Sequence, residues 1–376
     1  MRTIRLLFVL TSAVRGGVEE VVVSLLQRLP PEEFDLALAA PATLLKDLAG
    51  DLAGVPVATA AVQAESWQQT DEVRRLSALM ARLRPDVVNP HLFRSTVVAA
   101  PLARWHGVPA VIETYHGREG WRQGLLSGSF LPDRLVARCL HRVIAVSQAA
   151  RDFLVKGKGY PAGKIVVVPN GRDLSAYAPG RDREAVRKEL GLDAGTPLVG
   201  VVGRLEPQKG HRYLVDAWTK IVRELPDARL LIVGEGSLRT ALEAQARARG
   251  VAGSLIFAGF RADVPRLLDA VDVVALPSLY EGLPLTAIEA AAMARPLVAT
   301  AVDGTPEVVR DGSTGVLVPP ANPSALARGL LALLSNPEAA RGMGIAARAL
   351  ALERFDVRRN VEATAEVYRS AVRGRA

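Results

Sequence analysis

Short apolar runs alternate with longer helical patterns along the whole chain, and this alternation restricts the fold more than any other feature. It is typical of parallel sheets built from strand–helix–strand units. The first half of the sequence predicts six strands: Ile4–Leu10, Phe34–Ala40, Asp86–Asn89, Ala110–Thr114, Val143–Ser147 and Ile165–Pro169. The second half predicts six more: Leu198–Gly203, Arg229–Gly234, Leu255–Ala258, Val271–Leu276, Pro296–Ala299 and Thr314–Val318. We therefore expect an α/β protein with two doubly wound, Rossmann-like domains.

The segment from Pro169 to Pro197 separates the two sets of strands. It is rich in Pro, Gly and Asp, and it predicts one short helix near Arg183–Leu190. A length of 376 residues is more than twice that of a usual domain, and a hydrophobic fraction of 49% suffices for two buried cores. We predict an N-terminal domain over residues 1–170, a C-terminal domain over 171–355 and a separate last helix within 356–376.

The N-terminus permits two interpretations. Met1–Leu10 resembles a signal peptide faintly, but its apolar run is only five residues long, which favours a buried first strand. No stretch approaches the roughly 18 apolar residues of a membrane span. The single cysteine, Cys139, cannot form an internal disulfide, which is consistent with a cytoplasmic protein.

The net charge of +8 is distributed unevenly along the chain. The segment from His91 to Lys164 contains eleven Lys or Arg but only four Asp or Glu, so it carries nearly all of the excess. This asymmetry suggests an anionic partner, such as membrane lipid, nucleic acid or a phosphorylated substrate. An arginine-rich surface that faces only solvent explains the same count.

Ligands of doubly wound sheets bind outside the carboxyl ends of the strands, so the loops there are the candidate sites. Gly16 and Gly17 follow the first strand and precede a helical pattern, which suits either an anion at backbone N–H groups or an ordinary turn. Arg204 and Lys209 follow the strand Leu198–Gly203, where two cations can hold a diphosphate. The alternative is that both are surface cations.

Two further loops are less specific. Gly234-Glu235-Gly236 resembles half of a dinucleotide fingerprint, but Arg239 stands where the third glycine belongs and no acid ends the next strand. A nicotinamide or flavin enzyme is therefore disfavoured. The loop Phe260–Val264, with Arg261 and Val264, is apolar and cationic and suits contact with a nucleobase or none at all.

The most informative stretch is Ser278-Leu-Tyr-Glu-Gly-Leu-Pro-Leu-Thr-Ala-Ile-Glu289. Pro284 predicts a helix that begins near Leu285 or Thr286. Phosphate oxygens would suit the backbone N–H groups of Gly282, Leu283, Leu285 and Thr286. Glu289 lies in an apolar helix and needs hydrogen-bond donors, such as a ribose, whereas Glu281 can receive the hydroxyls of a sugar. A capping role for Glu281 and a solvated position for Glu289 remain the alternatives.

The paired glutamates in Tyr-Glu-Gly-Leu-Pro-Leu-Thr-Ala-Ile-Glu resemble the motif of glycosyltransferase family 4, whose members are retaining enzymes of the GT-B fold. Further matching motifs are Gly16-Gly17-Val18-Glu19, Thr114-Tyr115-His116-Gly117, Val168-Pro169-Asn170-Gly171-Arg172-Asp173, Gly203-Arg204-Leu205 with Lys209-Gly210, Val233-Gly234-Glu235-Gly236 and Asp311-Gly312-x-x-Gly315. The resemblance thus extends over nearly the whole chain. One departure is Val302-Asp303-Gly304, where many members have two adjacent glycines, so the role of Asp303 is open.

The resemblance implies a role for each candidate. It implies catalytic roles for His116, Glu281, Arg204 and Lys209. Donor binding would involve Gly16, Gly17, Arg204, Lys209, Arg261, Val264, Glu281, Gly282, Leu283, Pro284, Leu285, Thr286 and Glu289. The two domains would face a cleft, and the last helix would pack back on the first domain.

The implied reaction is transfer of a glycosyl unit from a nucleoside-diphosphate sugar to an acceptor hydroxyl, with retention. The chain has no Asp-x-Asp, so we expect no essential metal and no other cofactor, since two cations and a helix N-terminus can stabilise the leaving group. A nucleotide-sugar epimerase of the same fold and a non-catalytic sugar-binding protein are the rivals. We expect no nucleic-acid partner.

We expect the acceptor to be a glycolipid, a polysaccharide or a small glycoside. It is lipid-linked if the chain contacts a membrane, and a phosphorylated soluble acceptor is the alternative. Between residues 116 and 142 the chain mixes apolar residues with arginines: Trp121, Leu125, Leu126, Phe130, Leu131 and Leu135 with Arg118, Arg122, Arg134, Arg138 and Arg142. Such a segment suits peripheral contact with an anionic membrane, at its inner face for a cytoplasmic protein. It equally suits an apolar helix face that packs on a doubly wound domain.

Overall fold

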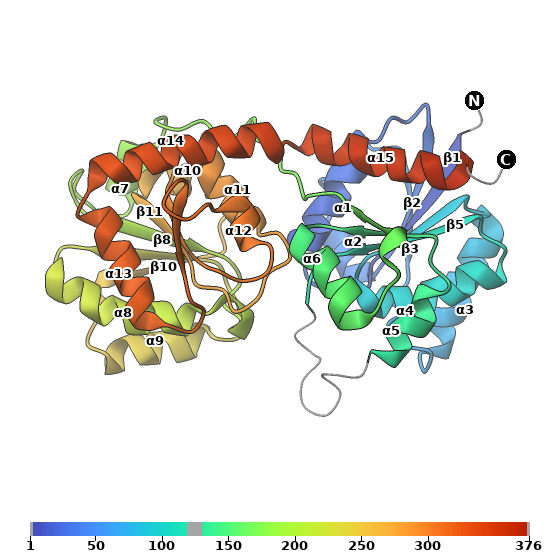
Figure 1. Cartoon of the computed structure of the whole chain (residues 1–376), viewed down its shortest axis with the longest axis horizontal. Coiled ribbons are helices and arrows are strands. Elements are labelled where there is room, and N and C mark those ends of the chain that lie inside the picture. The colour runs from blue at the N-terminus through green and yellow to red at the C-terminus, as the bar shows by residue number, and fades with distance from the viewer. Residues whose placement is uncertain (1–2, 119–129, 374–376) are drawn as a thin grey trace. The chain divides into compact units, whose positions relative to one another are not determined.

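The chain forms two compact units, each built on a parallel sheet with helices on both sides (Figure 1). The structure is a computed structural model that describes residues 3–118 and 130–373. Unit 1 consists of Met1–Gly171 with Val357–Ala376, and unit 2 is Arg172–Asp356. The predicted α/β fold with two doubly wound domains is therefore confirmed.

Unit 1 contains a seven-stranded sheet in the order β3-β2-β1-β4-β5-β6-β7. The strands are β1 (Ile4–Val9), β2 (Phe34–Ala40), β3 (Val57–Ala61), β4 (Val87–Pro90), β5 (Ala110–Tyr115), β6 (Arg142–Ala145) and β7 (Ile165–Val167). The α-helices are α1 (Gly17–Arg28), α2 (Ala42–Asp47), α3 (Thr70–Leu83), α4 (Leu92–Trp105), α5 (Leu131–Ala137), α6 (Gln148–Asp152) and α15 (Val357–Arg373). A π-helical turn, η2 (Phe153–Lys158), and a 3₁₀ turn, η3 (Ala162–Lys164), complete the unit.

Unit 2 contains a six-stranded sheet in the order β10-β9-β8-β11-β12-β13. The strands are β8 (Leu198–Val202), β9 (Arg229–Val233), β10 (Leu255–Gly259), β11 (Val273–Leu276), β12 (Leu297–Thr300) and β13 (Gly315–Val318). The α-helices are α7 (Arg183–Glu189), α8 (His211–Glu224), α9 (Arg239–Ala248), α10 (Val264–Ala270), α11 (Leu285–Ala292), α12 (Thr305–Val308), α13 (Pro323–Leu334) and α14 (Pro337–Arg354). Two 3₁₀ turns are η4 (Pro207–Lys209) and η5 (Ala252–Ser254).

The strand order reverses between β1 and β4 in unit 1 and between β8 and β11 in unit 2. At such a reversal the loops that follow the two neighbouring strands diverge, and ligands bind there. In unit 2 these are the loops with Arg204 and Lys209 and with Glu281. The topology thus brings together segments that the sequence separates.

All twelve predicted strands are present, and β3 is the strand that the sequence did not predict. Val57-Ala-Thr-Ala-Ala is rich in alanine, which has a low strand propensity, and it lies at the sheet edge with partly exposed side chains. It therefore lacks both the continuous apolar run of a buried strand and strong β-branched patterning.

The last helix, α15, belongs to unit 1. Arg369 donates from Nε to Glu33 at 2.8 Å, and the side-chain amide of Asn360 donates to the carbonyl of Pro169 at 2.7 Å. Tyr368 is fully buried and packs edge-on against Phe8 and Phe34. These contacts attach the last helix to residues near β1 and β2 and to the segment after β7.

Candidate active site

Two loops of unit 2 meet where its strand order reverses. β8 and β11 are parallel neighbours, and Lys209 follows the first strand whereas Glu281 follows the second. The loops are joined by two hydrogen bonds, from the N–H of Leu279 to the carbonyl of Gln208 at 2.8 Å and from the Gln208 amide to the carbonyl of Tyr280 at 3.0 Å. Two of the predicted catalytic residues are thus brought together on one rigid framework.

Glu281 has a buried carboxylate whose bonds are made within the site. Its Oε1 accepts from Nζ of Lys209 at 2.6 Å and from the hydroxyl of Ser278 at 2.7 Å, and the residue is only 6% exposed. A buried charge needs such partners, because desolvation without them is costly. The carboxylate caps no helix, since Pro284 precedes α11 without a side-chain cap. The capping alternative is therefore wrong.

Glycines allow the loops at this edge to approach closely. A Cβ at Gly210, which has φ of 65°, would lie 2.0 Å from the carbonyl oxygen of Pro277. A Cβ at Gly234 would lie 2.1 Å from the carbonyl oxygen of Gly203. The Gly234-Glu235-Gly236 sequence therefore has a packing role between the loops after β8 and β9.

Asp303 is a residue of this site whose role the sequence left open. Its Oδ2 accepts the backbone N–H of Glu281 at 2.9 Å, from a left-handed backbone with φ of 42°. The side chain thereby holds the turn that carries Glu281. The only signal of this role in the sequence was that Asp303 stands where many family members have two adjacent glycines. Glycine adopts a left-handed backbone readily, so a position that often holds glycine can indicate such a conformation.

Glu289 lies on α11 and is 7% exposed, so the solvated alternative is wrong. Its Oε1 is 2.8 Å from Nε of Arg172, which also donates to the hydroxyl of Tyr177 at 3.5 Å. Burial and then the charge of Glu289 raise the pKa of Tyr177, so this phenol stays protonated. Arg172 and Tyr177 satisfy the buried carboxylate, and the sequence did not predict either partner. The ribose role of Glu289 stays a prediction.

The first turn of α11 supplies backbone donors beside this pair of glutamates. The helix begins at Leu285 after Pro284, as the sequence predicted. Within the described chain, the N–H groups of Gly282, Leu285 and Thr286 have no hydrogen-bond partner. Pro284 has no N–H, so it contributes shape and no donor. The N-terminal end of a helix favours an anion.

The two predicted arginines of unit 2 differ in their surroundings. Arg204 is exposed and makes no ion pair with any described residue, so its guanidinium is available to a ligand. Arg261 is instead bonded to Asp263 at 2.7 Å and to Glu189 at 3.0 Å. Its guanidinium lowers the pKa of Asp263 to about 2. Val264 begins α10 and is half-buried, and contact of this loop with a base stays a prediction.

Gly16, Gly17 and His116 belong to unit 1. Gly16 caps α1 in an extended conformation, and Gly17 is the first residue of that helix. His116 follows β5, and its Nε2 lies 2.8 Å from Nδ1 of His91, with the two rings stacked at 5.1 Å. Burial lowers the pKa of His116 to about 3 and that of His91 well below its usual value, so both rings are neutral at pH 7.

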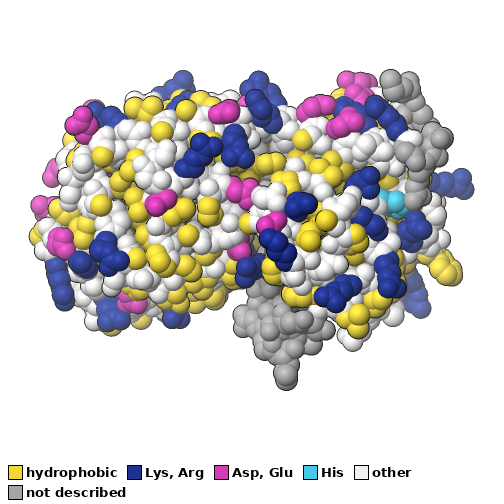
Figure 2. Space-filling model, in the orientation of Figure 1, with side chains coloured by type: hydrophobic (Ala, Val, Ile, Leu, Met, Phe, Trp, Pro, Cys, Tyr) yellow, Lys and Arg dark blue, Asp and Glu magenta, His cyan; other side chains and the backbone are white. Residues whose placement is uncertain are grey.

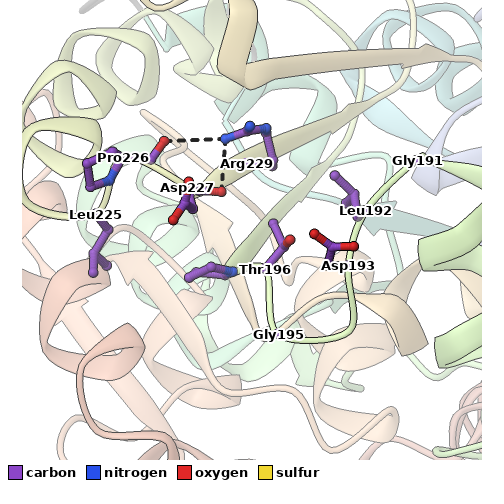
Figure 3. A pocket seen from close by; sticks show the side chains of 10 residues that line it. Gly191, Leu192, Asp193, Gly195, Thr196, Leu225, Pro226, Asp227 and Arg229 are labelled. Atoms are coloured by element: carbon purple, nitrogen blue, oxygen red, sulfur yellow. Dashed lines mark hydrogen bonds between the residues drawn. The ribbon is translucent and has the colours of Figure 1, made fainter.

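A pocket of about 530 Å³ in unit 2 lies elsewhere (Figure 3). It is lined by the segments that lead into β8 and β9 and by Arg229, the first residue of β9, which donates to the carbonyls of Pro226 and Asp227. Among the described residues no group of His, Cys, Asp and Glu is arranged to hold a metal ion. The helices of the described chain include none that is long and apolar enough to cross a bilayer.

Comparison with known families agrees with this geometry. A family model described as "Glycosyltransferase Family 4" matches residues 15–176, and one described as "Glycosyl transferases group 1" matches residues 182–350. A D-inositol 3-phosphate glycosyltransferase of Segniliparus rotundus is 34% identical in an alignment of 306 residues, and the match covers 77% of this chain and 67% of that protein. The chain belongs to glycosyltransferase family 4. It is therefore an enzyme that transfers glycosyl groups.

Matches to other proteins also cover most of this glycosyltransferase. A UDP-Gal:alpha-D-GlcNAc-diphosphoundecaprenol alpha-1,3-galactosyltransferase of Escherichia coli is 28% identical in an alignment of 312 residues, and the match covers 81% of each chain. The crystal structure of HepE of Anabaena in complex with UDP and glucose has a TM-score of 0.84 at 24% identity, and it covers 98% of this chain and 100% of that one. This likeness shows the fold of the glycosyltransferase, which is GT-B.

Proposed function

We propose that this glycosyltransferase transfers a hexosyl unit from a nucleoside-diphosphate sugar to an acceptor hydroxyl, with retention at the anomeric carbon. The observation that carries the proposal is the Lys209–Glu281 pair at the carboxyl ends of β8 and β11, with exposed Arg204 in the same loop as Lys209. A cation pair for a diphosphate and a carboxylate for sugar hydroxyls are what such a donor requires. The E. coli relative takes a UDP-sugar by its name, and HepE binds UDP and glucose, which supports this choice.

The proposal assigns roles in this reaction to the predicted residues. Arg204 and Lys209 bind the diphosphate. The N–H groups of Gly17, Gly282, Leu283, Leu285 and Thr286 assist them. Glu289 binds the ribose, the loop at 260–264 contacts the base, and Glu281 and His116 contact the sugar. As the bond between the anomeric carbon and the phosphate oxygen breaks, the acceptor oxygen bonds to the same face of that carbon. The departing phosphate takes the acceptor proton, and fixed cations and helix dipoles stabilise its charge.

The decisive experiment is a thermal-shift screen with a panel of nucleotide sugars, followed by turnover with the best one. A ligand at a hundred times its Kd adds roughly 2.7 kcal/mol to the free energy of unfolding, so the true donor is identifiable. The sugar configuration of the product, measured by NMR, tests retention. An epimer formed from donor alone would support the epimerase rival, and binding without turnover on any acceptor would support a sugar-binding protein.

Turnover is proposed to need no metal ion. Lys209 and Arg204 supply the positive charge that a chelated metal would otherwise supply. Activity should therefore survive treatment with excess chelator. Loss of activity that a divalent cation restores would contradict this part of the proposal.

The acceptor is proposed to be lipid-linked, reached from the inner face of a membrane by peripheral contact of unit 1. α4 and α5 pack together, and Trp105, Leu131 and Leu135 are 86%, 62% and 51% exposed on them. Arg104, Arg138 and Arg142 are exposed nearby in the sequence, and Figure 2 shows Lys and Arg side chains spread over the face of unit 1 that it presents. Apolar anchors beside cations bind anionic lipid. Trp121, Arg122, Leu125 and Leu126 lie outside the described residues.

Co-sedimentation with vesicles that contain anionic lipid tests this surface. The wild type should bind at low salt, because each nearby cation adds about 1 kcal/mol to the free energy of membrane binding. It should dissociate at high salt, because salt screens this attraction. Arg138→Glu/Arg142→Glu should abolish binding, whereas Arg223→Glu/Arg341→Glu, which reverses two exposed cations of unit 2, should not. A wild type that stays in the supernatant at low salt would favour a phosphorylated soluble acceptor.

A further inference from the structure

A line of hydrogen-bonded side chains in unit 1 connects α15 to His116. The hydroxyl of Tyr368 donates to Oδ1 of Asn89 at 2.7 Å, and Nε2 of His91 lies 3.0 Å from the same oxygen. Nδ1 of His91 lies 2.8 Å from Nε2 of His116. Tyr368, Asn89 and His91 are all fully buried. Residues from three distant parts of the chain therefore form one continuous polar network, which is fully buried except at His116.

The orientation of the Asn89 side chain is fixed by its other contacts. Its Nδ2 is 2.5 Å from the carbonyl oxygen of Ile112 and 3.0 Å from the hydroxyl of Thr114. A backbone carbonyl can only accept, so the nitrogen of the amide must face Ile112. The amide oxygen then faces Tyr368 and His91, and it can only accept from both.

The position of each ring proton follows from that orientation. Because Oδ1 of Asn89 is an acceptor, Nε2 of His91 carries a proton. A neutral imidazole has one N–H, so Nδ1 of His91 is bare and accepts from Nε2–H of His116. Neutral His116 then has its lone pair on Nδ1. Burial lowers the pKa of both rings, which supports the neutral forms used here.

We propose that Tyr368, Asn89 and His91 are positioning residues that hold His116 in the Nε2-protonated tautomer, so that its Nδ1 accepts a hydrogen bond from a hydroxyl of the donor sugar. The proposal rests on the proposed function in that it takes His116 as a contact of the sugar. Nδ1 makes no hydrogen bond to any residue that the structure describes. A bare ring nitrogen at pH 7 suits a hydroxyl donor, whereas an imidazolium would repel one.

The tautomer can be measured without any turnover. In the full-length protein with nitrogen-15-labelled histidines, the ring nitrogen shifts report which nitrogen is protonated. The chain has five histidines, and a His116→Gln variant identifies the signal of His116. We expect a single neutral, Nε2-protonated ring at pH 7. An Nδ1-protonated ring or a mixture of tautomers in the wild type would overturn the proposal.

Two substitutions at His91 separate positioning from packing. His91→Phe keeps a ring against His116 but removes both nitrogens, so the signal of His116 should become a mixture and kcat/KM for the sugar donor should fall about tenfold or more, the factor for a hydrogen bond of about 1.4 kcal/mol. His91→Gln offers an acceptor to His116 and a donor to Asn89, so it should keep one tautomer and most of the activity. Equal behaviour of the two variants would contradict positioning.

Tyr368→Phe should weaken the polar network because it removes one hydrogen bond to Asn89, and Tyr160→Phe is its matched control. Tyr160 is also a buried tyrosine of unit 1, but its hydroxyl lies 3.4 Å from Glu113 and is not part of the polar network. The first variant should lower kcat/KM for the sugar donor more than the second, with affinity for free nucleoside diphosphate unchanged in both. Addition of the sugar donor should shift the Nδ1 signal of His116 in the wild type. A fixed tautomer whose signal no nucleotide sugar perturbs would refute the sugar contact, whereas failure of every donor to turn over would refute the proposed function alone.

Discussion

Nζ of Lys209 lies 2.6 Å from Oε1 of Glu281, although the two residues are 72 positions apart along the chain. One is proposed to bind the diphosphate and the other the sugar, so the two halves of the donor meet at a single ion pair. Each side chain also neutralises the charge of the other, and Glu281 needs this partner because its carboxylate is buried. Substitution of either residue therefore changes stability as well as ligand binding.

The first prediction separates these two effects. Lys209→Met removes the ammonium, so affinity for free nucleoside diphosphate should fall about tenfold, and the unpaired carboxylate of Glu281 should lower the free energy of unfolding by about 1–3 kcal/mol. The double variant Lys209→Met/Glu281→Gln should recover stability but not nucleotide affinity. Calorimetric titration and denaturant unfolding measure both. Unchanged affinity in Lys209→Met would refute the diphosphate role.

The second prediction concerns the two glutamates of the motif. Glu289→Ala should weaken binding of both the free nucleotide and the sugar donor, because the ribose is common to both. Glu281→Ala should leave affinity for the free nucleotide nearly intact and lower kcat, because the sugar is absent from the free nucleotide. Titration with each ligand distinguishes them. If both variants lose nucleotide affinity equally, the assigned division of roles is wrong.

The sequence predicted the sheets better than the contacts within the site. Twelve strands are short apolar runs and could be recognised, whereas the alanine-rich edge strand β3 could not. The motif identified Glu281 and Glu289, since spacing within one segment is visible in the sequence. The partners Lys209, Arg172 and Asp303 come from other segments, and pairing between loops depends on the register of the sheet. Local patterns do not encode that register.

The third prediction tests the close approach of the loops. Gly210→Ala would place a methyl group against the carbonyl of Pro277 and strain a left-handed backbone, so it should destabilise unit 2 and weaken nucleotide binding by displacing Lys209. Gly253→Ala is the control, since a Cβ there meets nothing within 4 Å. Thermal unfolding and nucleotide titration should show lower stability and weaker nucleotide binding only for Gly210→Ala. Equal melting temperatures for the two would contradict the tight contact.

The fourth prediction concerns acid stability and His211, which begins α8. The ring is 1% exposed, neither nitrogen has a hydrogen-bond partner among the described residues, and burial lowers its pKa to about 4. Because the unfolded chain binds this proton near pH 6.5 and the folded chain only near 4, the native state loses stability as pH falls through that window. The loss is at most about 1.4 kcal/mol per pH unit for this one group. Denaturant unfolding at pH 7 and pH 5 should show a smaller loss in His211→Phe, and an equal loss would contradict the assignment.

The last prediction concerns Asp303, whose carboxylate holds the backbone N–H of Glu281 at 2.9 Å. Asp303→Ala removes that acceptor and places alanine, which has no polar side chain to stabilise a left-handed backbone, at φ of 42°. The turn that carries Glu281 should therefore lose its fixed position. We expect kcat to fall about tenfold, with affinity for free nucleotide nearly unchanged, because Lys209 and Arg204 remain. Asp303→Asn should retain most of the activity, since its amide oxygen can accept the same N–H and Asn tolerates a left-handed backbone. Steady-state kinetics of the two variants decides the matter: if Asn is as damaging as Ala, the charge of Asp303 is what matters and its role lies with the substrate rather than with the turn.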